Sequence, residues 1–386
     1  MRKYIYPMAA LLAAGCLLIG GVIPVRASAE EELGTGCKAA YACDFVSGTP
    51  IYTKNETERL PIASMCKIMT LLLSFEAVDR GELQYDEQIT VSENASGMGG
   101  SQVYLDTGLS YSAQDLMKTV AVCSANDSCV ALAERVAGSE SAFVDRMNTR
   151  ARELGAENTL FANCTGLPKE PQYSCAKDVS LMLREMLRHE KYYEFSKVWL
   201  EDFAHPDGRT TQITNTNKLV RSYNGCDGGK TGFTNEAGFC LAATAKRGDT
   251  RLISVVIGAE NSKERFGAVS KMLDFGFANY ENKPLLEAGQ PLESRVPVRA
   301  GKVKDIAVGA ETPLFAFCKK GEAGDYTIEY AFRDDLRAPI AAGDDVGEAV
   351  LYRDGVEICR TRLVSLDNVE KRSWWDSFRD LARDWQ

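Results

Sequence analysis

Apolar residues recur on one helical face in several segments of the first two thirds of the chain. Between Ala63 and Arg80 they follow helical spacing, and Gly81 comes directly after. This pattern predicts a helix that buries one face and ends at the glycine. We expect further helices at 112–123, 127–136, 141–154, 174–187 and 264–280, the fifth in chain order being capped by Ser174.

Two later segments, 239–245 and 251–259, are rich in apolar and β-branched residues, and a polar turn at 246–250 joins them. They predict a hairpin within a sheet. Because predicted helices lie before and after this hairpin, we expect an α/β (α+β) domain at residues 30–292, with helices around an antiparallel sheet.

After Glu293 the pattern changes to short alternating runs separated by glycine, such as Val296 with Val298 and Ile306 with Val308. Alternation with a period of two is typical of half-buried strands. Residues 293–366 are therefore predicted to form a small all-β domain.

The last segment, 367–386, is predicted to carry an amphipathic helix from Lys371 to Gln386. Three of the four tryptophans of the chain lie in it, at helical spacing with Phe378 and Leu381. Tryptophan favours the boundary between lipid and water, so we interpret this helix as one that lies in the plane of a membrane surface. Docking on this chain or on a partner is the alternative, because aspartates interspersed in the helix weaken its attraction to an anionic surface.

The chain begins with Arg2 and Lys3, an apolar run from Ile5 to Val25 and the small-residue stretch Ala27-Ser28-Ala29. This order is typical of a secretory signal peptide, which we predict at residues 1–29. The apolar run is also long enough to remain as an uncut membrane anchor. In both cases we expect the rest of the chain to be exported, at the outer face of the cytoplasmic membrane.

Charge and composition exclude several functions. The chain has 386 residues and a formal net charge of −9, whereas nucleic-acid binding needs a basic surface, so no nucleic-acid partner is expected. With two histidines and no C-x-x-C, neither a metal site nor a cofactor is predicted. Twelve cysteines less Cys16 in the signal peptide leave eleven, so at least one thiol is free in the monomer. Cys226–Cys240 and Cys37–Cys43 are candidate disulfides, between which the sequence does not decide.

A serine and a lysine at the start of the first predicted helix suggest a nucleophile and its base. No G-x-S-x-G occurs and neither histidine lies in a context typical of a catalytic site, so a Ser-His-Asp triad is not expected. Ser64 and Lys67 are three residues apart, which places both side chains on one face of a helix. The positive end of the helix and apolar surroundings both favour a neutral amine, and such an amine can take the proton of the serine hydroxyl.

Two further motifs complete the pattern. Ser-x-x-Lys alone is common and recurs at 174–177. Ser124-Ala125-Asn126 lies at a junction between two predicted helices, and Lys230-Thr231-Gly232, which occurs once, leads into the predicted hairpin. S-x-x-K, S-x-N and K-T-G in this order are typical of penicillin-binding proteins and serine β-lactamases. We expect them at a helix start, an interhelix turn and a strand start.

On these motifs the chain resembles the low-molecular-mass penicillin-binding proteins of the serine D-Ala-D-Ala carboxypeptidase type, peptidase family S11. The resemblance covers residues 37–386, including the β domain and the terminal helix, and it implies a fold like that of DD-peptidases and β-lactamases. Besides the motifs, the segments that carry it are 61–70, 143–148, 163–167, 215–219, 227–234 and 251–256. Cys66, Cys164 and Phe233 depart from the family pattern without removing a reacting group.

The resemblance implies roles for the reacting residues. Ser64 resembles the nucleophile that becomes acylated, and Lys67 its base. Ser124 would relay a proton between Lys67, Lys230 and the leaving amine, while Lys230 adds positive potential. The backbone N–H groups of Ser64 and Phe233 would form the oxyanion hole.

The resemblance also implies how the substrate is held. Asn126 would bind a peptide amide of the substrate, and Thr231, followed by Gly232, its terminal carboxylate. Arg265 matches an arginine of the family that faces this carboxylate. The implied substrate is a peptidoglycan stem peptide that ends in D-Ala-D-Ala, and β-lactam antibiotics would acylate the same serine.

Three other functions remain open at this point. A class A β-lactamase uses a glutamate in an E-x-x-L-N segment, but here Glu157 to Leu160 is followed by Phe161, which favours slow release of penicillin. A DD-endopeptidase or transpeptidase would share the acyl-enzyme, and the sequence does not separate an acceptor water from an acceptor amine. A non-catalytic wall-binding protein would not need the complete set of reacting residues. We therefore predict a serine D-alanyl-D-alanine carboxypeptidase.

Overall fold

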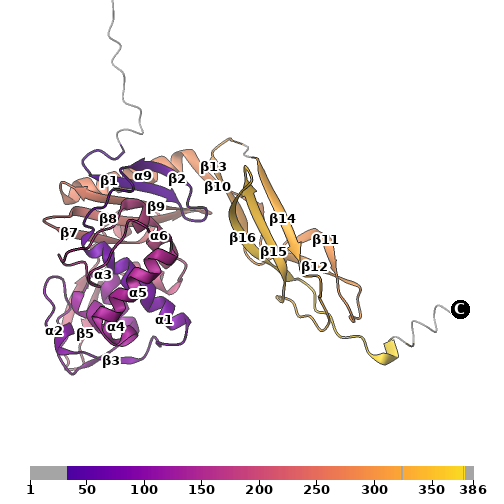
Figure 1. Ribbon diagram of the computed structural model, residues 1–386, viewed down its shortest axis with the longest axis horizontal. Coiled ribbons are helices and arrows are strands. Elements are labelled where there is room, and N and C mark those ends of the chain that lie inside the picture. Colours follow the sequence, from indigo (N-terminus) through magenta and orange to yellow (C-terminus); the bar gives the residue numbers. More distant parts are fainter. Residues whose placement is uncertain (1–32, 323–324, 377, 379–386) are drawn as a thin grey trace, which may run out of the picture.

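The computed structural model describes residues 33–322, 325–376 and 378. The predicted signal peptide at 1–29 and most of the predicted terminal helix lie outside these residues. The described chain forms a larger mixed domain and a smaller β domain. Figure 1 shows the β domain extending away from the larger one, with the last described residues at its far end.

A five-stranded antiparallel sheet forms the centre of the larger domain. Its strands, in spatial order, are β2 (Pro50–Lys54), β1 (Ala39–Asp44), β9 (Thr250–Ala259), β8 (Gly238–Arg247) and β7 (Cys226–Thr234). The predicted hairpin is confirmed as β8 and β9. Strands β1 and β2 are not predicted from the sequence, because all six residues of β1 are buried and show no alternation with a period of two.

Helices cover both faces of this sheet. On one face, α9 (Ser262–Asn279) packs against β8 and β9. On the other face, α6 (Ala176–Met186) contacts β1, β8 and β9 and packs against α1 (Lys67–Asp79). Around α1 lie α3 (Ala113–Val122), α4 (Asn126–Ala137) and α5 (Glu140–Glu153). An apolar core forms on each side of the sheet.

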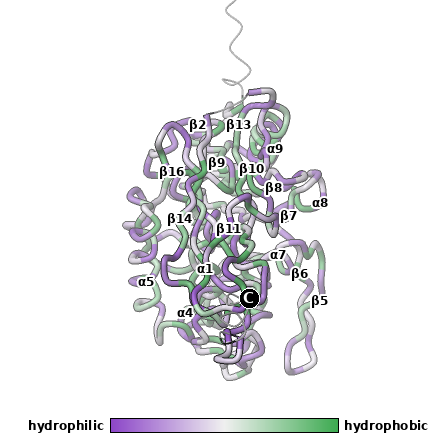
Figure 2. Tube along the Cα trace, turned by 90° about the vertical axis from the view of Figure 1, so that its right-hand side faces the viewer, coloured by the Kyte–Doolittle hydropathy of each residue, from purple (hydrophilic) through white to green (hydrophobic). Residues whose placement is uncertain are grey.

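The remaining elements of the larger domain are short. They are η1 (Ala63–Cys66), α2 (Glu93–Ser96), α7 (Lys191–Ser196), α8 (Leu219–Ser222) and two strand pairs, β3 (Gln88–Thr90) with β4 (Ser110–Ser112) and β5 (Leu200–Ala204) with β6 (Thr210–Thr214). Figure 2 shows the β5–β6 hairpin projecting from the body of the domain.

The six helices predicted between residues 63 and 280 are all present, with one correction to a cap. The helix predicted at 174–187 is α6, and its N-cap is Cys175, whose Sγ accepts a hydrogen bond from the Asp178 N–H at 3.4 Å. Ser174 is not the cap, because its hydroxyl forms a 2.8 Å hydrogen bond with Thr159 Oγ1. The cap therefore depends on a contact between segments and not on the local pattern alone.

The described part of the smaller domain consists of strands and turns, as predicted. One five-stranded antiparallel sheet has the order β11 (Pro291–Pro297), β12 (Asp305–Ala310), β16 (Val356–Ser365), β15 (Asp345–Arg353) and β14 (Tyr326–Phe332). A separate pair joins β10 (Tyr280–Leu286) to β13 (Leu314–Lys319), so strand pairing of this domain begins before residue 293, which falls inside β11.

The described start of the terminal helix, Trp374 to Asp376, follows the β domain. Within the described residues, no helix has both the length and the apolar character needed to cross a membrane.

Candidate active site

Ser64 and Lys67 lie on a tighter turn than the sequence predicts. The chain enters through Ala63 with a φ of 46°, and residues 63–66 form the 3₁₀ turn η1 before α1 begins at Lys67. Ser64 is half-buried and the Lys67 side chain is fully buried. Lys67 Nζ donates a hydrogen bond to Ser64 Oγ at 3.0 Å. The amine and hydroxyl are thus paired, although Ser64 lies within a 3₁₀ turn and not in the α-helix itself.

The loop at 163–167 supports this pair from one side. The carbonyl of Thr165 accepts a hydrogen bond from Lys67 Nζ. At the next residue, Gly166, φ is 80° and a Cβ would lie 2.1 Å from the carbonyl oxygen of Ala63. Only glycine allows this close approach together with this backbone conformation.

Strand β7 supports the same turn from the other side. At Gly232 a Cβ would lie 2.7 Å from the carbonyl oxygen of Ile62 and 3.1 Å from the nitrogen of Ser64. The K-T-G strand therefore lies directly against the backbone of the candidate nucleophile, which a side chain at this position would prevent.

Ser124 belongs to the turn between α3 and α4, and Asn126 is the first residue of α4. Ser124 has a φ of 67°, an uncommon conformation for a residue with a side chain. Ser124 Oγ and Asn126 Oδ1 are buried and have no hydrogen-bond partner among the described residues. Asn126 Nδ2 donates to the carbonyl of Gly99 at 2.7 Å, which orients the amide. Buried polar atoms without partners are rare and call for an explanation, which a bound substrate would supply.

Thr216 joins this turn to β7. Its N–H donates to the carbonyl of Val122 at 3.0 Å, two residues before Ser124. Its hydroxyl accepts a 2.8 Å hydrogen bond from Thr231 Oγ1. The S-x-x-K, S-x-N and K-T-G segments are therefore adjacent in space.

Lys230 lies in the middle of β7, so the expectation that the strand starts there is wrong: pairing with β8 begins at Cys226. The side chain is 1% exposed, and its Nζ donates to the carbonyl of Thr231 at 3.1 Å. Burial, and next the positive charge of Lys67, lower the pKa of Lys230 to about 7. An amine with this pKa can both take up and release a proton near neutral pH.

Arg265 reaches β7 from α9. Its Nη1 donates to the carbonyls of Gly232 at 3.1 Å and Cys240 at 3.3 Å, while its Nε is buried without a partner among the described residues. Burial lowers the pKa of Arg265. The guanidinium lies 5.5 Å from the centre of the Phe239 ring, which is 4.4 Å from that of Phe233. Phe233 is 51% exposed and forms an aromatic edge beside the K-T-G motif.

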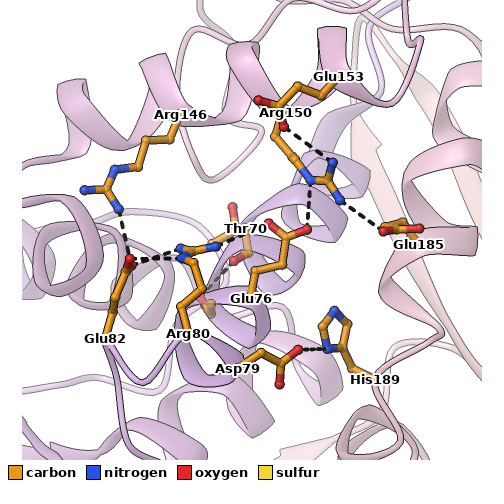
Figure 3. Close-up of polar contacts among 11 residues, drawn as sticks. Thr70, Glu76, Asp79, Arg80, Glu82, Arg146, Arg150, Glu153, Glu185 and His189 are labelled. Carbon is orange, nitrogen blue, oxygen red and sulfur yellow. Dashed lines mark hydrogen bonds and ion pairs between the residues drawn. The ribbon is translucent and has the colours of Figure 1, made fainter. Parts of the chain in front are cut away.

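Ion pairs fix the C-terminal end of α1, the helix that begins at Lys67 (Figure 3). Arg150 of α5 contacts Glu76 of α1 at 2.8 Å and Glu185 of α6 at 3.0 Å. Asp79, the last residue of α1, lies 3.0 Å from His189. These contacts join three helices and so fix the direction of α1 relative to the site.

The cysteines near the site are thiols. Every cysteine among the described residues is free, so neither candidate disulfide forms. Cys66, next to Lys67, is buried and its Sγ donates to the carbonyl of Asn163 at 3.2 Å. Burial raises the pKa of this thiol. The part of the chain that the structure describes also holds no cluster of side chains suited to a metal ion.

Sequence reasoning gave no role to three residues that shape the site: Thr165, Gly166 and Thr216. Both segments that contain them, 163–167 and 215–219, carry part of the family resemblance, which was the available signal. Two of the three contribute through the backbone, so the residue type alone does not reveal the contact.

Comparisons with known proteins show which families the two parts of the chain match. The model of the peptidase S11 family, D-alanyl-D-alanine carboxypeptidase, matches residues 26–261, and that of the C-terminal domain of penicillin-binding protein 5 matches residues 280–371. The D-alanyl-D-alanine carboxypeptidase DacF of Bacillus subtilis is 39% identical over 92% of this chain and 91% of its own length.

Solved structures share the architecture. Penicillin-binding protein 5 of Haemophilus influenzae is 31% identical, with a TM-score of 0.66 over 87% of this chain and 98% of that one. Penicillin-binding protein D2 of Listeria monocytogenes in its ampicillin-bound form is 32% identical, with a TM-score of 0.57 over 63% of this chain and 98% of that one. The predicted fold class is thereby confirmed. The chain belongs to the D-alanyl-D-alanine carboxypeptidases of peptidase family S11.

Proposed function

We propose that this serine carboxypeptidase removes the terminal D-alanine from peptidoglycan stem pentapeptides through an acyl-enzyme on Ser64. Family membership supports the activity. The observation that carries the proposed mechanism is the 3.0 Å hydrogen bond from the buried amine of Lys67 to the half-buried hydroxyl of Ser64. A nucleophile needs such a base within hydrogen-bond reach.

Acylation starts when Lys67 takes the hydroxyl proton and Ser64 Oγ attacks the carbonyl carbon of the penultimate D-alanine. The backbone N–H groups of Ser64 and Phe233 stabilise the oxyanion that forms. The C–N bond then breaks, and Ser124 Oγ passes the proton from Lys67 to the nitrogen of the departing D-alanine. Lys230 adds positive potential, and its pKa of about 7 suits a group that shares protons with this relay.

Three polar side chains of the site are suited to hold the substrate. Asn126 Oδ1 is suited to accept a hydrogen bond from a peptide N–H of the stem peptide. Thr231 Oγ1 and the guanidinium of Arg265 are suited to the terminal carboxylate, since Arg265 already lies against the carbonyl of Gly232. Gly232 itself leaves the space that a side chain would fill next to Ser64.

Deacylation returns the enzyme to its starting state. A water molecule attacks the Ser64 ester, its hydroxyl becomes part of the new carboxylate of the shortened peptide, and its proton returns to the serine oxygen. β-Lactams are proposed to acylate the same hydroxyl, which the ampicillin-bound form of a related penicillin-binding protein supports.

Mass spectrometry with a synthetic pentapeptide ending in D-Ala-D-Ala tests the mechanism. We expect release of one D-alanine per peptide, a transient acyl adduct on Ser64 and stoichiometric labelling by fluorescent penicillin. Ser64→Ala should lose all three, whereas Ser222→Ala, at an exposed serine of α8, should keep them. Rapid catalytic turnover of penicillin would instead identify a β-lactamase.

We also propose that the chain is exported and that its terminal helix binds the membrane surface. The signal-like residues 1–29 support export. Trp374, Trp375 and Phe378 are 68%, 63% and 54% exposed, as expected of side chains that insert into an interface. Sedimentation of the chain without residues 1–29 in the presence of phosphatidylglycerol vesicles should show binding that Trp374→Ala/Trp375→Ala removes, and unchanged binding of this variant would contradict the role of the helix.

A further inference from the structure

The β domain has one sheet edge that is protected and one that is open. Its five-stranded sheet ends in β11 on one side and β14 on the other. β11 begins and ends with Pro291 and Pro297, and its pairing with β12 shifts register between Pro291 and Arg295. Prolines and bulges protect an edge against pairing with another chain. β14 pairs with β15 along all seven residues without a shift, contains no proline and has a single charged residue, Glu329.

The register of the β14–β15 ladder shows which backbone groups face outward. The N–H of Arg333 donates to the carbonyl of Val346 at 3.0 Å, which continues the ladder past the end of β14. In an antiparallel pair, successive residues direct their backbone groups alternately toward the partner strand and away from it. Ile328, Tyr330 and Phe332 therefore point their N–H and C=O groups away from β15, where no other described strand pairs with β14.

A groove of about 520 Å³ adjoins this open edge. Tyr330 of β14 lines it together with residues of β10 and β11, so the groove lies between the two edges of the sheet, where Figure 1 shows β11 and β14 next to each other. Leu285 and Leu292 contribute apolar surface, and the Tyr330 side chain is 43% exposed. An extended chain placed along β14 would therefore direct side chains into a ready-made groove.

The charge of this groove indicates the chemistry of its occupant. Of the described residues that line it, Glu287 and Glu293 are charged and exposed, and none is basic. Neither glutamate belongs to an ion pair among the described residues, whereas other acids of the domain do, as Glu311 pairs with Arg362. Two carboxylates without an ion-pair partner among the described residues, an apolar wall and an open strand edge are complementary to an extended segment with alternating basic and apolar side chains.

We propose that β14 binds such a segment of a partner protein as an added strand, with basic side chains toward Glu287 and Glu293 and apolar ones against Leu292 and Tyr330. The backbone groups of the added strand pair with those that β14 directs outward, and the side chains set specificity. This surface contains none of the residues proposed for catalysis, so binding at β14 and acylation of Ser64 can be measured independently.

The first test uses labelled peptides on the full chain. An acetylated, amidated peptide of four lysines alternating with three valines should bind in a fluorescence-anisotropy titration. The glutamate–valine counterpart should not bind, because it repels Glu287 and Glu293. A lysine–valine peptide with N-methyl groups on one edge of its backbone should bind at least about tenfold more weakly, because that edge can no longer donate to β14.

Two variants test the surface itself. Glu287→Gln/Glu293→Gln should weaken binding of the lysine–valine peptide about tenfold. The matched control Glu157→Gln/Glu260→Gln changes two exposed glutamates of the larger domain that form no ion pair among the described residues, and it should bind as the parent does. Tyr330→Pro removes an outward N–H that the β15 ladder does not use and should also abolish binding, while Tyr330→Ala keeps this N–H and should weaken binding less.

Several results would overturn the proposal. Unchanged affinity of the glutamine variant, equal binding of the N-methylated peptide, or no binding at about 1 mM peptide would each do so. A dimer in sedimentation analysis that Tyr330→Pro dissociates would assign the edge to a second copy of this chain instead. Labelling by fluorescent penicillin and far-ultraviolet circular dichroism report whether each variant is folded. If Tyr330→Pro fails to fold, the N-methylated peptide still decides the strand-pairing claim.

Discussion

The two domains differ in where their charged side chains lie: some are buried in the larger domain, whereas those described in the β domain lie at the surface. In the larger domain the side chains of Lys67 and Lys230 are 0% and 1% exposed, and Ser124 Oγ and Arg265 Nε are buried without partners among the described residues. In the β domain, ion pairs lie at the surface, as in Arg333–Asp345, whose side chains are 56% and 34% exposed. The buried polar residues described after β10 are Thr361 and Ser365, which are uncharged and hydrogen-bonded.

This difference marks where the chemistry is. Removing an ammonium group from water costs several kcal/mol, as an order of magnitude, and a sheet that only has to fold can avoid that cost. The β domain shows that this chain builds a well-packed sheet without buried charge. The free-energy cost of burying Lys67 and Lys230 in the larger domain is therefore best explained by a catalytic role that needs buried amines. Ionisable groups in perturbed surroundings are concentrated at functional sites.

The largest effect is expected for Lys67, where a substitution should abolish activity without lowering stability. Lys67→Met removes the amine and keeps an apolar stem, so acylation by penicillin should fall by about 10³-fold or more, because the base is lost. The melting temperature should stay the same or rise, since methionine does not require a polar amine to be removed from water. Stopped-flow acylation and calorimetry measure the two quantities, with Lys319→Met, at an exposed lysine of β13, as the matched control. A marked fall in melting temperature would show that the amine stabilises the fold.

The second effect concerns a charge pair that the larger domain does bury. Arg251 donates from Nη1 and Nη2 to the two carboxylate oxygens of Asp227 at 2.7 and 2.8 Å, and the side chains are 11% and 16% exposed. Asp227→Ala should lower the free energy of unfolding by about 3 kcal/mol, because it leaves a largely buried guanidinium without its counter-charge. Urea denaturation measures this change. The double variant Asp227→Ala/Arg251→Met should recover part of the loss, and failure to recover any would mean that packing, not charge, explains it.

This pair also shows which features the sequence could predict. The helices predicted between residues 63 and 280 and the β8–β9 hairpin follow from local spacing, and the structure contains them. Contacts between distant segments do not follow from spacing. Asp227 and Arg251 are 24 residues apart on strands separated by β8, and the carbonyl that holds Lys67 comes from a residue 98 positions away.

Two local expectations failed for the same physical reason. Ser64 was expected to open an α-helix, but Gly166 and Gly232 press against the turn from both sides and the chain forms η1 instead. Ser174 was expected to cap α6, but its hydroxyl pairs with Thr159. In both cases a tertiary contact overrides the local preference, and such contacts are not visible in one sequence.

The third effect depends on pH. The pKa of Lys230 is about 7 in the folded chain, below the ordinary lysine value of 10.5. Between these values the unfolded chain binds more protons than the folded one, so stability rises with pH. The destabilisation due to this lysine is therefore complete below about pH 7 and is relieved toward about pH 10.5. The free energy of unfolding of Lys230→Met should exceed that of the parent most near pH 6. This difference should shrink by up to about 1.4 kcal/mol per pH unit between about pH 7 and pH 10.5.

Urea denaturation of the parent and of Lys230→Met at several pH values between about 6 and 10 checks this expectation. Acylation by penicillin should titrate over the same range in the parent, since Lys230 is proposed to share protons with the relay. A difference in stability that stays constant with pH would mean that Lys230 keeps its ordinary pKa in the folded chain.

The smallest effect is expected in the β domain. Arg333→Ala breaks an ion pair whose two partners remain in contact with water, so Asp345 is solvated after the change and loses little. We expect the free energy of unfolding to change by less than about 0.5 kcal/mol, and by still less at high salt, because ions screen exposed charges. Urea denaturation of Arg333→Ala, Asp345→Ala and the double variant isolates the pair energy. A loss as large as that of Asp227→Ala would break the comparison between the domains. It would mean that solvent exposure does not determine how much an ion pair of this chain contributes to stability. The free-energy cost of burying the amines near Ser64 would then no longer be an argument that they serve catalysis.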